Sequence, residues 1–398
     1  MINNSFVDRL MSFFENKESK NEVTKLLVTI IRGKAQKMQD NLVIAYAGTD
    51  YENARYWASM FLNNPQNGVP EMFSELNLKK DLMKKHPDCS LLLQEYSPAT
   101  SFISIEKSFI VPRFINTALD ISPPLNEILK KSKSGFGRIA RWVRAQNLSY
   151  ECVNTPEAQQ EFYYQMYLPF ITKRHEDSAL IVSFENIFSS KIRSDLIMVT
   201  KNGERLAGAV LHYWKNRPTL GFFGVKMDKI DEVQRWNTGA MYYFAMLWAK
   251  NAGITTLHLG GSSAFLLNGI NILKNKLGGR IDVDVPWQNS GMVVLSLLKK
   301  TDEMKRFLAS NPFAFVGIEG DLKAAVWLPS SKNPDLAETI RQIDSATKLG
   351  IQDVDVFGWY SAQQISALQN EFKMAKISFS FVGDFYSHWK LFFLNHDI

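Results

Sequence analysis

The clearest alternation of apolar and polar positions lies between residues 195 and 286. Two apolar runs, DLIMVT and RLAGAVLHYW, are joined by KNGE, and an Asn-Gly pair between such runs is typical of a two-residue hairpin turn. A third apolar run, TLGFFGV, follows the short segment KNRP. The pattern therefore predicts three antiparallel strands joined as a meander.

A helical pattern follows the third run. Apolar residues stand at positions 233, 236, 240, 241, 244, 247 and 248, the spacing of one helix face, and a stop follows at Asn251. Beyond it we expect a strand at ITTLHL, a helix over residues 263–277 and a strand at RIDVDVPW. The predicted order is β-β-β-α-β-α-β. A turn of small residues follows the fourth strand: Gly260, Gly261, Ser262 and Ser263.

The regions on either side carry shorter patterns. Residues 1–92 are predicted to be mostly helical, with one strand, LVIAYAG, and a loop at NNPQNGVP. Further strands are expected at LLLQEY and SFISIEKSFIVP. Near the C-terminus, DLKAAVWLP and DVDVFGWY are predicted as strands around the helix PDLAETIRQIDSATKLG. We expect three regions, 1–128, 129–300 and 301–398.

The composition is that of an ordinary globular protein. The 398 residues are enough for two or three domains. Cys89 and Cys152 are too few for a disulfide framework or for a zinc site made of thiolates. No secretory signal is apparent, and the longest stretch without Lys, Arg, Asp or Glu, Asn251–Leu273, is too polar for a membrane span. We expect a cytoplasmic protein without a membrane span.

The charge adds one feature to this picture. A net charge of +6 with a pI near 9.0 permits a polyanionic partner such as RNA but does not require one. The most basic stretch lies between Glu127 and Glu151, which enclose no other acid. Its cations are Lys130, Lys131, Lys133, Arg138, Arg141 and Arg144. Two interpretations stay open: a solvated basic helix, or a surface that contacts phosphates.

The same stretch contains GFGRIA, which formally matches a dinucleotide-binding turn. Such a turn needs a buried strand directly before it, and here a lysine-rich segment stands in that place. The sequence therefore does not predict a dinucleotide site.

Three stretches carry a resemblance to a known superfamily. They are GERLAGAVLHYW in the hairpin, HLGGSSA at the end of the fourth strand, and ILKNKLGG in the following helix. Together with the order of elements, they resemble the GNAT acyltransferase superfamily and, more narrowly, the Fem family of peptidoglycan-bridge and related aminoacyl transferases. The resemblance covers residues from about 130 to 290 and implies an α/β fold. In that fold a mixed, mostly antiparallel sheet is flanked by helices, and a tandem or degenerate second GNAT-like unit is expected.

The resemblance also implies a site. In the family a lysine at the position of Lys274 lies near the transferred carbonyl and the terminal nucleotide of the donor. A fixed ammonium can stabilise the oxyanion that forms when an amine attacks an ester. The aromatic residue that precedes it in the family is replaced here by Leu273. The small-residue turn and Lys276 are expected to bind the donor. The alternative is that both lysines are solvated charges near a helix C-terminus.

Two donors are considered, and no further cofactor is expected. An acyl-CoA-dependent enzyme would show Arg/Gln-x-x-Gly-x-Gly/Ala before the long helix, but here Trp236 stands three residues before Gly239. Residues 260–280 also lack the tyrosine that protonates a leaving thiolate in many such enzymes. Aminoacyl-tRNA is therefore favoured, with Arg138, Arg141 and Arg235 as phosphate contacts. The expected acceptor is an amine of a small molecule, a peptide or an envelope precursor. An acyl-CoA enzyme and a catalytically inactive binding module remain as alternatives.

Other chemistry is weakly supported. No H-x-x-x-H or H-E-x-x-H spacing occurs, so no metal site is expected. The serines at 262 and 263 are interpreted as turn residues or helix N-caps rather than nucleophiles. His258 is interpreted as a core histidine. Asp282 and Asp284 share one face of a strand and are interpreted as a solvent-facing edge, although a role in binding the acceptor amine is also considered.

Overall fold

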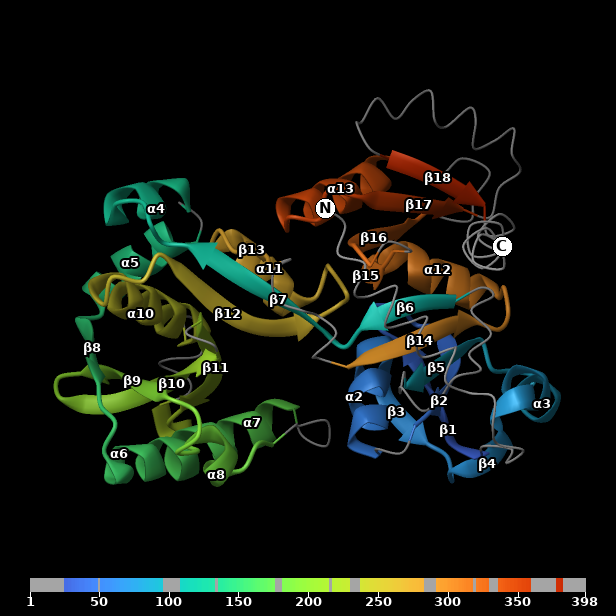
Figure 1. Ribbon diagram of the computed structural model, residues 1–398, viewed down its shortest axis with the longest axis horizontal. Coiled ribbons are helices and arrows are strands. Elements are labelled where there is room, and N and C mark those ends of the chain that lie inside the picture. Colours follow the sequence, from blue (N-terminus) through green and yellow to red (C-terminus); the bar gives the residue numbers. More distant parts are fainter. Residues whose placement is uncertain are drawn as a thin grey trace, which may run out of the picture. The chain divides into compact units, whose positions relative to one another are not determined.

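The computed structural model describes residues 25–48, 51–95, 108–132, 135–175, 181–214, 217–229, 237–282, 291–317, 320–328, 336–358 and 377–381. The chain forms two compact units, and each collects segments that are distant in sequence (Figure 1). Unit 1 consists of Met1–Ile115, Ser263–Asn268 and Pro286–Ile398, and unit 2 of Asn116–Ser262 and Gly269–Val285. This division differs from the three consecutive regions that the sequence led us to expect.

Unit 2 contains a mixed sheet that runs in the order β13-β7-β12-β11-β10-β9-β8. Strands β8 to β11 pair antiparallel, whereas β11 and β12 pair parallel, with Thr219 opposite His258. The strands are β7 (Phe114–Asp120), β8 (Leu148–Cys152), β9 (Ser194–Lys201), β10 (Glu204–Trp214), β11 (Arg217–Val225), β12 (Thr256–Ser263) and β13 (Arg280–Ile281).

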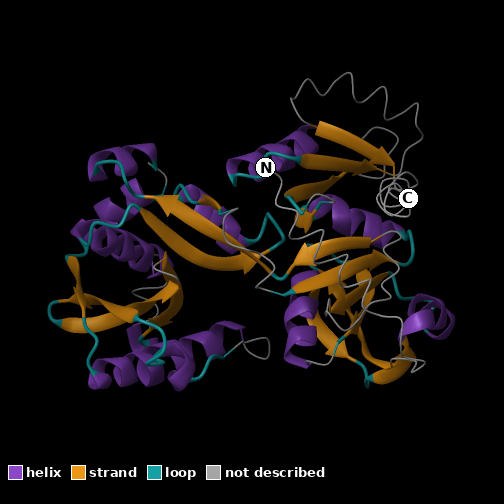
Figure 2. Cartoon of the chain, in the orientation of Figure 1, coloured by secondary structure: helices purple, strands orange, loops and turns teal. Residues whose placement is uncertain are grey.

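Helices cover both faces of this sheet, as Figure 2 shows. Along β9, Ile197 packs into the core beside α5 and α10, whereas Met198 packs against η2 on the other face. This alternation follows from the period of two in a strand. The helical segments are α4 (Leu125–Lys131), α5 (Phe136–Ala145), α6 (Pro156–Glu161), η2 (Phe162–Tyr167), α7 (Leu168–His175), α8 (Phe184–Ile187), η4 (Met227–Lys229), α10 (Asn237–Asn251) and α11 (Gly269–Lys276).

The predicted order of elements is confirmed in unit 2 as β9-β10-β11-α10-β12-α11-β13. Asn202 and Gly203 form the hairpin turn with φ values of 52° and 84°, as the Asn-Gly signal predicts. Two details of the prediction are wrong. The small-residue segment Gly260–Ser263 continues strand β12 instead of ending it, and α11 begins at Gly269 rather than at residue 263.

Unit 1 contains a second sheet, which in the described residues has the order β18-β17-β16-β15-β6-β14-β5-β2-β1-β3, with β4 paired to β1. Its strands are β1 (Lys25–Ala35), β2 (Asn41–Ala47), β3 (Leu62–Asn67), β4 (Glu71–Ser74), β5 (Leu91–Glu95), β6 (Ser108–Pro112), β14 (Met292–Leu297), β15 (Phe313–Val316), β16 (Leu322–Trp327), β17 (Val354–Gly358) and β18 (Ile377–Phe381). Its helical segments are α2 (Tyr51–Phe61), η1 (Glu75–Asn77), α3 (Leu78–Lys85), α12 (Asp302–Ser310) and α13 (Leu336–Lys348).

The prediction of a mostly helical N-terminal region is wrong for the residues from 25 onward that the structure describes. The run LLVTII in β1 is rich in β-branched and apolar residues, and β1 pairs with β2, β3 and β4. The predicted loop NNPQNGVP lies largely in β3, an edge strand, where Pro65 costs no ladder hydrogen bond. The C-terminal strands β16 and β17 and the helix α13 are confirmed.

The fold class is thus confirmed as α/β, with two mixed sheets that are mostly antiparallel and flanked by helices. No helix within the described ranges is both long and apolar enough to cross a bilayer.

Candidate functional site

Lys274 of α11 lies buried against strand β12, with 1% of its surface exposed. Its Nζ donates hydrogen bonds to the carbonyl oxygens of Gly260 (2.7 Å) and Gly261 (3.1 Å) and to Oγ of Ser262 (2.7 Å). An ammonium has three hydrogens, so all of them are used by this segment of β12. The structure therefore brings Lys274 and three of the four predicted small residues together.

The conformation of Gly260 makes this arrangement possible. Its φ is +75°, and a Cβ at this position would meet the carbonyl oxygen of Leu220 at 2.7 Å, so a side chain does not fit. Successive carbonyls of a regular strand point in opposite directions, whereas the left-handed residue lets two of them face one ammonium. We call Gly260–Ser262, with the Lys274 amine that they hold, the lysine-anchored bend.

Burial also sets the protonation of Lys274. Loss of solvation lowers the pKa of its amine from 10.5 to about 7. A neutral amine keeps two N–H donors for the two carbonyls, and its lone pair can accept from the Ser262 hydroxyl instead of donating to it. The three hydrogen bonds of Lys274 can therefore form whether its amine is charged or neutral. The alternative of a solvated charge is wrong for Lys274, but Lys276 is exposed.

The other predicted site residues are dispersed. Ser263 is buried and accepts a hydrogen bond from the backbone N–H of Phe265, in unit 1. Arg138 and Arg141 are exposed on α5. Arg235 lies outside the described residues.

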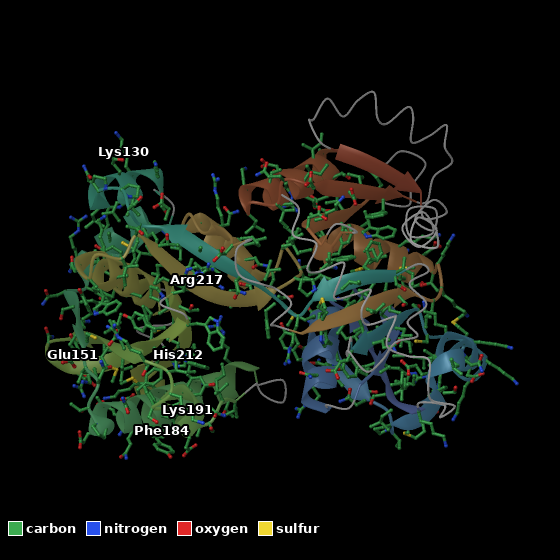
Figure 3. The ribbon with its side chains drawn as sticks, viewed as in Figure 1. Lys130, Glu151, Phe184, Lys191, His212 and Arg217 are labelled. Atoms are coloured by element: carbon green, nitrogen blue, oxygen red, sulfur yellow. The ribbon has the colours of Figure 1, made fainter. Side chains whose placement is uncertain are left out.

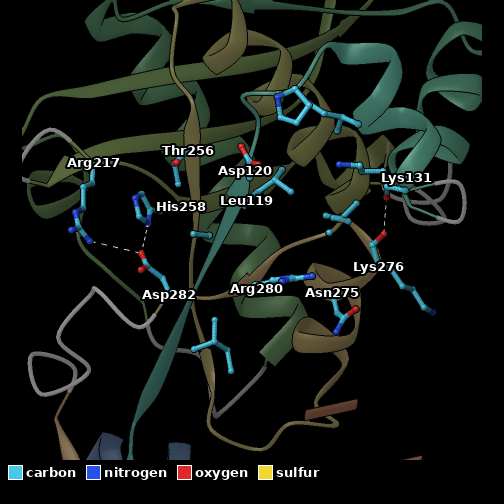
Figure 4. Close-up of a pocket in the computed structure, with 17 residues that line it drawn as sticks. Leu119, Asp120, Lys131, Arg217, Thr256, His258, Asn275, Lys276, Arg280 and Asp282 are labelled. Carbon is cyan, nitrogen blue, oxygen red and sulfur yellow. Dashed lines mark hydrogen bonds and ion pairs between the residues drawn. The ribbon is translucent and has the colours of Figure 1, made fainter. Parts of the chain in front are cut away.

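A cavity of about 870 Å³ lies within unit 2, beside the C-terminal end of α11 (Figure 4). Strands β7, β11, β12 and β13 and the end of α4 form its other walls. The charged and imidazole side chains that line it are Asp120, Lys131, Arg217, His258, Lys276, Arg280 and Asp282. Lys274 is not among the lining residues.

Three of these side chains form one group. Nδ1 of His258 lies 2.9 Å from Oδ2 of Asp282, and Nη1 of Arg217 lies 3.8 Å from the same oxygen. Figure 4 shows the arginine and the imidazole both turned toward the carboxylate. Asp282 is fixed in turn, since its backbone N–H donates to the carbonyl oxygen of Asn116 in β7. His258 thus comes from β12 and Asp282 from the position directly after β13, and these strands lie on either side of β7.

Burial keeps this imidazole neutral at physiological pH. Loss of solvation is the largest effect and lowers the pKa of His258 below 6.5, and Arg217 lowers it further, while Asp282 acts in the opposite direction. The residue is 8% exposed. His258 is buried, as expected of a core histidine, but its side chain also lines the cavity. The expectation of a solvent-facing Asp282 is wrong, because only 9% of its side chain is exposed. Asp284 lies outside the described residues.

The end of α11 is held against α5 by Ser132. Its Oγ accepts from the backbone N–H of Phe136 (3.0 Å), at the start of α5, and donates to the carbonyl oxygen of Lys276 (2.7 Å). Gly135 lies in the same contact, and a Cβ there would overlap both the Lys276 carbonyl and the Ser132 hydroxyl. The GFGRIA stretch is therefore a close helix–helix contact rather than a phosphate-binding turn.

The described residues contain no group of three or more His, Cys, Asp or Glu side chains arranged to hold a metal ion. The cavity wall instead carries four Lys or Arg side chains against two carboxylates, and one of these carboxylates is paired within the group around His258.

Comparison with protein-family models finds no match, and neither does comparison with curated proteins. Solved structures align over much of the chain at low identity. The C-terminal domain of a putative lysylphosphatidylglycerol synthetase from Agrobacterium fabrum aligns with a TM-score of 0.34 and 12% identity, over 76% of this chain and 94% of that chain. L-PGS from Bacillus licheniformis gives 0.32 and 11%, over 74% and 92%. FemX gives 0.31 and 14%, over 62% and 78%. Likeness at this level does not establish an activity.

Proposed function

We propose that the chain is an N-acyltransferase, which moves an acyl or aminoacyl group from an activated ester or thioester to an amine. The observation that carries the proposal is the lysine-anchored bend, which lies two residues beyond His258 on the strand that lines the cavity. Donors that are held in place beside a polar cavity suit acyl transfer, because they stabilise the charge that develops on the carbonyl oxygen.

The role of the bend follows from the charge that develops in this reaction. When an amine attacks an ester, the carbonyl oxygen becomes an oxyanion, and donors already in place stabilise it. In our proposal the donor's carbonyl oxygen replaces the Ser262 hydroxyl on Nζ of Lys274. The carbonyl oxygens of Gly260 and Gly261 keep the amine oriented during the exchange.

We favour aminoacyl-tRNA as the donor because of the surface beside the cavity. The exposed cations of α4 and α5 are Lys130, Lys131, Arg138, Arg141 and Arg144. Lys131 also lines the cavity, so the basic surface reaches its edge. In Figure 3, Lys130 projects outward from α4. Such a surface suits the phosphates of an acceptor stem.

An acyl-CoA donor has less support. The glycine that a pyrophosphate loop would use, Gly239, lies inside α10, in the first turn after Asn237. A Cβ on Gly239 would meet Cδ1 of Ile139 at 3.0 Å, so packing against α5 explains this glycine. The third candidate, a catalytically inactive binding module, predicts binding without transfer.

The test offers each donor separately to the purified protein. With tRNA charged with radiolabelled amino acids, we expect protein-dependent loss of label from acid-precipitable RNA when a mixture of primary amines is present. With acetyl-CoA and the same amines, we expect no release of free thiol. The opposite result would replace our donor by the acyl-CoA alternative, and transfer from neither would favour the inactive module.

Two variants sharpen this test. Lys274→Met removes the amine but keeps much of the side-chain volume, and we expect it to lose transfer. Lys191→Met removes an exposed charge from unit 2 that does not line the cavity, and serves as the matched control. If Lys274→Met stays folded and transfers at the wild-type rate, the assignment of the site is wrong.

A further inference from the structure

We propose that the cavity holds the amine acceptor and that His258, oriented by Asp282, takes the proton that the amine loses. This inference rests on the acyl-transfer function proposed above. It adds a base, which the sequence alone did not provide, and a class of acceptor.

The geometry of the imidazole supports a base. Nδ1 lies 2.9 Å from the Asp282 carboxylate without the angle of a hydrogen bond, and the negative charge of that carboxylate favours the hydrogen of the neutral ring on Nδ1, which leaves the lone pair on Nε2. Nε2 makes no hydrogen bond with any residue that the structure describes. The side chain lines the cavity, so Nε2 is the ring nitrogen left for a ligand.

The position of His258 along β12 supports the same role. Residues two apart along a strand are separated by about 7 Å. His258 and Gly260 have this relationship, so the imidazole and the lysine-anchored bend are neighbours on one strand. An amine that contacts the imidazole is therefore within reach of a carbonyl bound at the bend, as a nucleophile must be.

Burial and the neighbouring charges determine the pKa of the His258 imidazole. Asp282 and Arg217 are the charged side chains that act on its ring, and they act in opposite directions. Burial has the largest effect and Arg217 acts in the same direction, so together they outweigh Asp282, and the ring is neutral at pH 7 and can accept a proton. A buried carboxylate behind the ring stabilises the imidazolium once it forms.

The rest of the cavity wall indicates what the acceptor carries. Arg280, Lys131 and Lys276 line it and form no ion pair within the part of the chain that the structure describes. The charge of Lys131 also acts on the carboxylate of Asp120. In Figure 4 Arg280 lies between the His258 group and Asn275. Guanidinium and ammonium groups bind phosphate or carboxylate. We therefore infer an acceptor with both a primary amine and an anionic group.

The step balances as an aminolysis. The amine nitrogen bonds to the carbonyl carbon of the donor, and its proton passes to Nε2 of His258. The C–O bond of the ester then breaks, and the imidazolium returns the proton to the departing alkoxide. The products are an amide and an alcohol, and His258 ends neutral as it began.

The first experiment measures transfer against pH for wild type and matched variants. His258→Asn keeps an N–H donor near Nδ1 for Asp282 but has no Nε2, and we expect transfer to fall about 100-fold, within the usual range for a general base. In wild type we expect an acid limb with an apparent pKa below 6.5, and this limb should be lost in His258→Asn. A limb from the acceptor's own amine lies at higher pH and remains in every variant.

His212 provides the matched control. It also lies on a strand of unit 2, and burial also lowers its pKa, but its Nε2 contacts the carbonyl oxygen of Ile187 and it does not line the cavity. His212→Asn should leave the pH profile unchanged. If His258→Asn transfers with the wild-type rate and profile, the proposed base is refuted even though the acyltransferase itself is real.

The second experiment needs no activity. In protein labelled with ¹³C-histidine, the signal missing from His258→Asn identifies this residue among the six histidines. We expect O-phosphoethanolamine to shift the His258 signal more than ethanolamine or inorganic phosphate does, and to leave His212 unmoved. If wild type transfers from neither donor, the proposed function fails, and this titration still decides the acceptor site. The absence of any shift at His258 with all three probes would overturn the inference.

Discussion

Lys274 gives the most direct test of the structure, because its burial predicts a specific dependence of stability on pH. Its amine is buried, and its pKa falls from 10.5 in the unfolded chain to about 7 in the folded protein. Between these values the unfolded chain binds more protons than the folded one. The free energy of unfolding therefore rises with pH over this range. The direction is the reverse of that for a lysine that gains a carboxylate partner.

The magnitude follows from the two pKa values. For a folded pKa near 7 and an unfolded pKa of 10.5, the contribution of this group grows by about 2 kcal/mol between pH 7 and pH 9. Lys274→Met lacks this group. The difference in free energy of unfolding between wild type and variant should therefore shift by about 2 kcal/mol in favour of wild type over these two pH units.

The assay is urea denaturation at pH 7, 8 and 9, followed by far-UV circular dichroism and by tryptophan fluorescence. Coincident transitions of the two signals establish that a single free energy describes the change. Taking the difference between the two proteins at each pH removes the contribution of every other titrating group. Lys276→Met should show no such shift relative to wild type, since that side chain is exposed.

A constant difference between wild type and Lys274→Met from pH 7 to pH 9 would refute the reasoning. It would mean that the amine stays charged in the folded protein, stabilised by its three acceptors more strongly than burial destabilises it. The anchored bend would then be a fixed cation over the whole physiological range.

Three further predictions concern the surroundings of the cavity. Gly135→Ala should lower the free energy of unfolding by about 1–3 kcal/mol in urea denaturation because its Cβ overlaps backbone. Gly269→Ala, which has open space, should change that energy little, and equal effects would refute the close contact. Replacing Arg138 and Arg141 by Glu should weaken tRNA binding in filter assays and reduce the salt slope by about 2, and an unchanged slope would exclude them as phosphate contacts. Arg217→Met should raise the pKa of the cavity imidazole in an NMR titration, because this arginine lowers that pKa, and a fall would contradict the assigned charges.

Local signals in the sequence were sufficient where a short segment determines its own conformation. The Asn202–Gly203 hairpin and the helix that ends before Gly253 are of this kind, since backbone preference and apolar spacing act over a few residues. Strand β3 was missed because its polar residues pair along an edge, where composition carries little information.

The site was predicted only in part for a similar reason. The contact of Lys274 with the small residues joins neighbouring segments of one β-α unit, and the family resemblance pointed to it. The pairing of His258 with Asp282 depends on β7, which comes from a region more than 100 residues earlier and lies between their strands. No periodicity within residues 254–286 indicates that a distant strand lies between β12 and β13. His258 was therefore interpreted as a core residue and Asp282 as a surface residue.

The interleaved order of the strands has a consequence for synthesis on the ribosome. In unit 1, β14 lies between β5 and β6, although roughly 180 residues separate it from β6 along the chain. Until β14 leaves the exit tunnel, the buried apolar strands β5 and β6 each lack a neighbour and leave unpaired edges. The segments of unit 2 are complete by Val285, before β14 has been translated. The sheet of unit 1 therefore cannot be completed until most of the chain has been synthesised. Proteins truncated before residue 292 are expected to aggregate or to require chaperones.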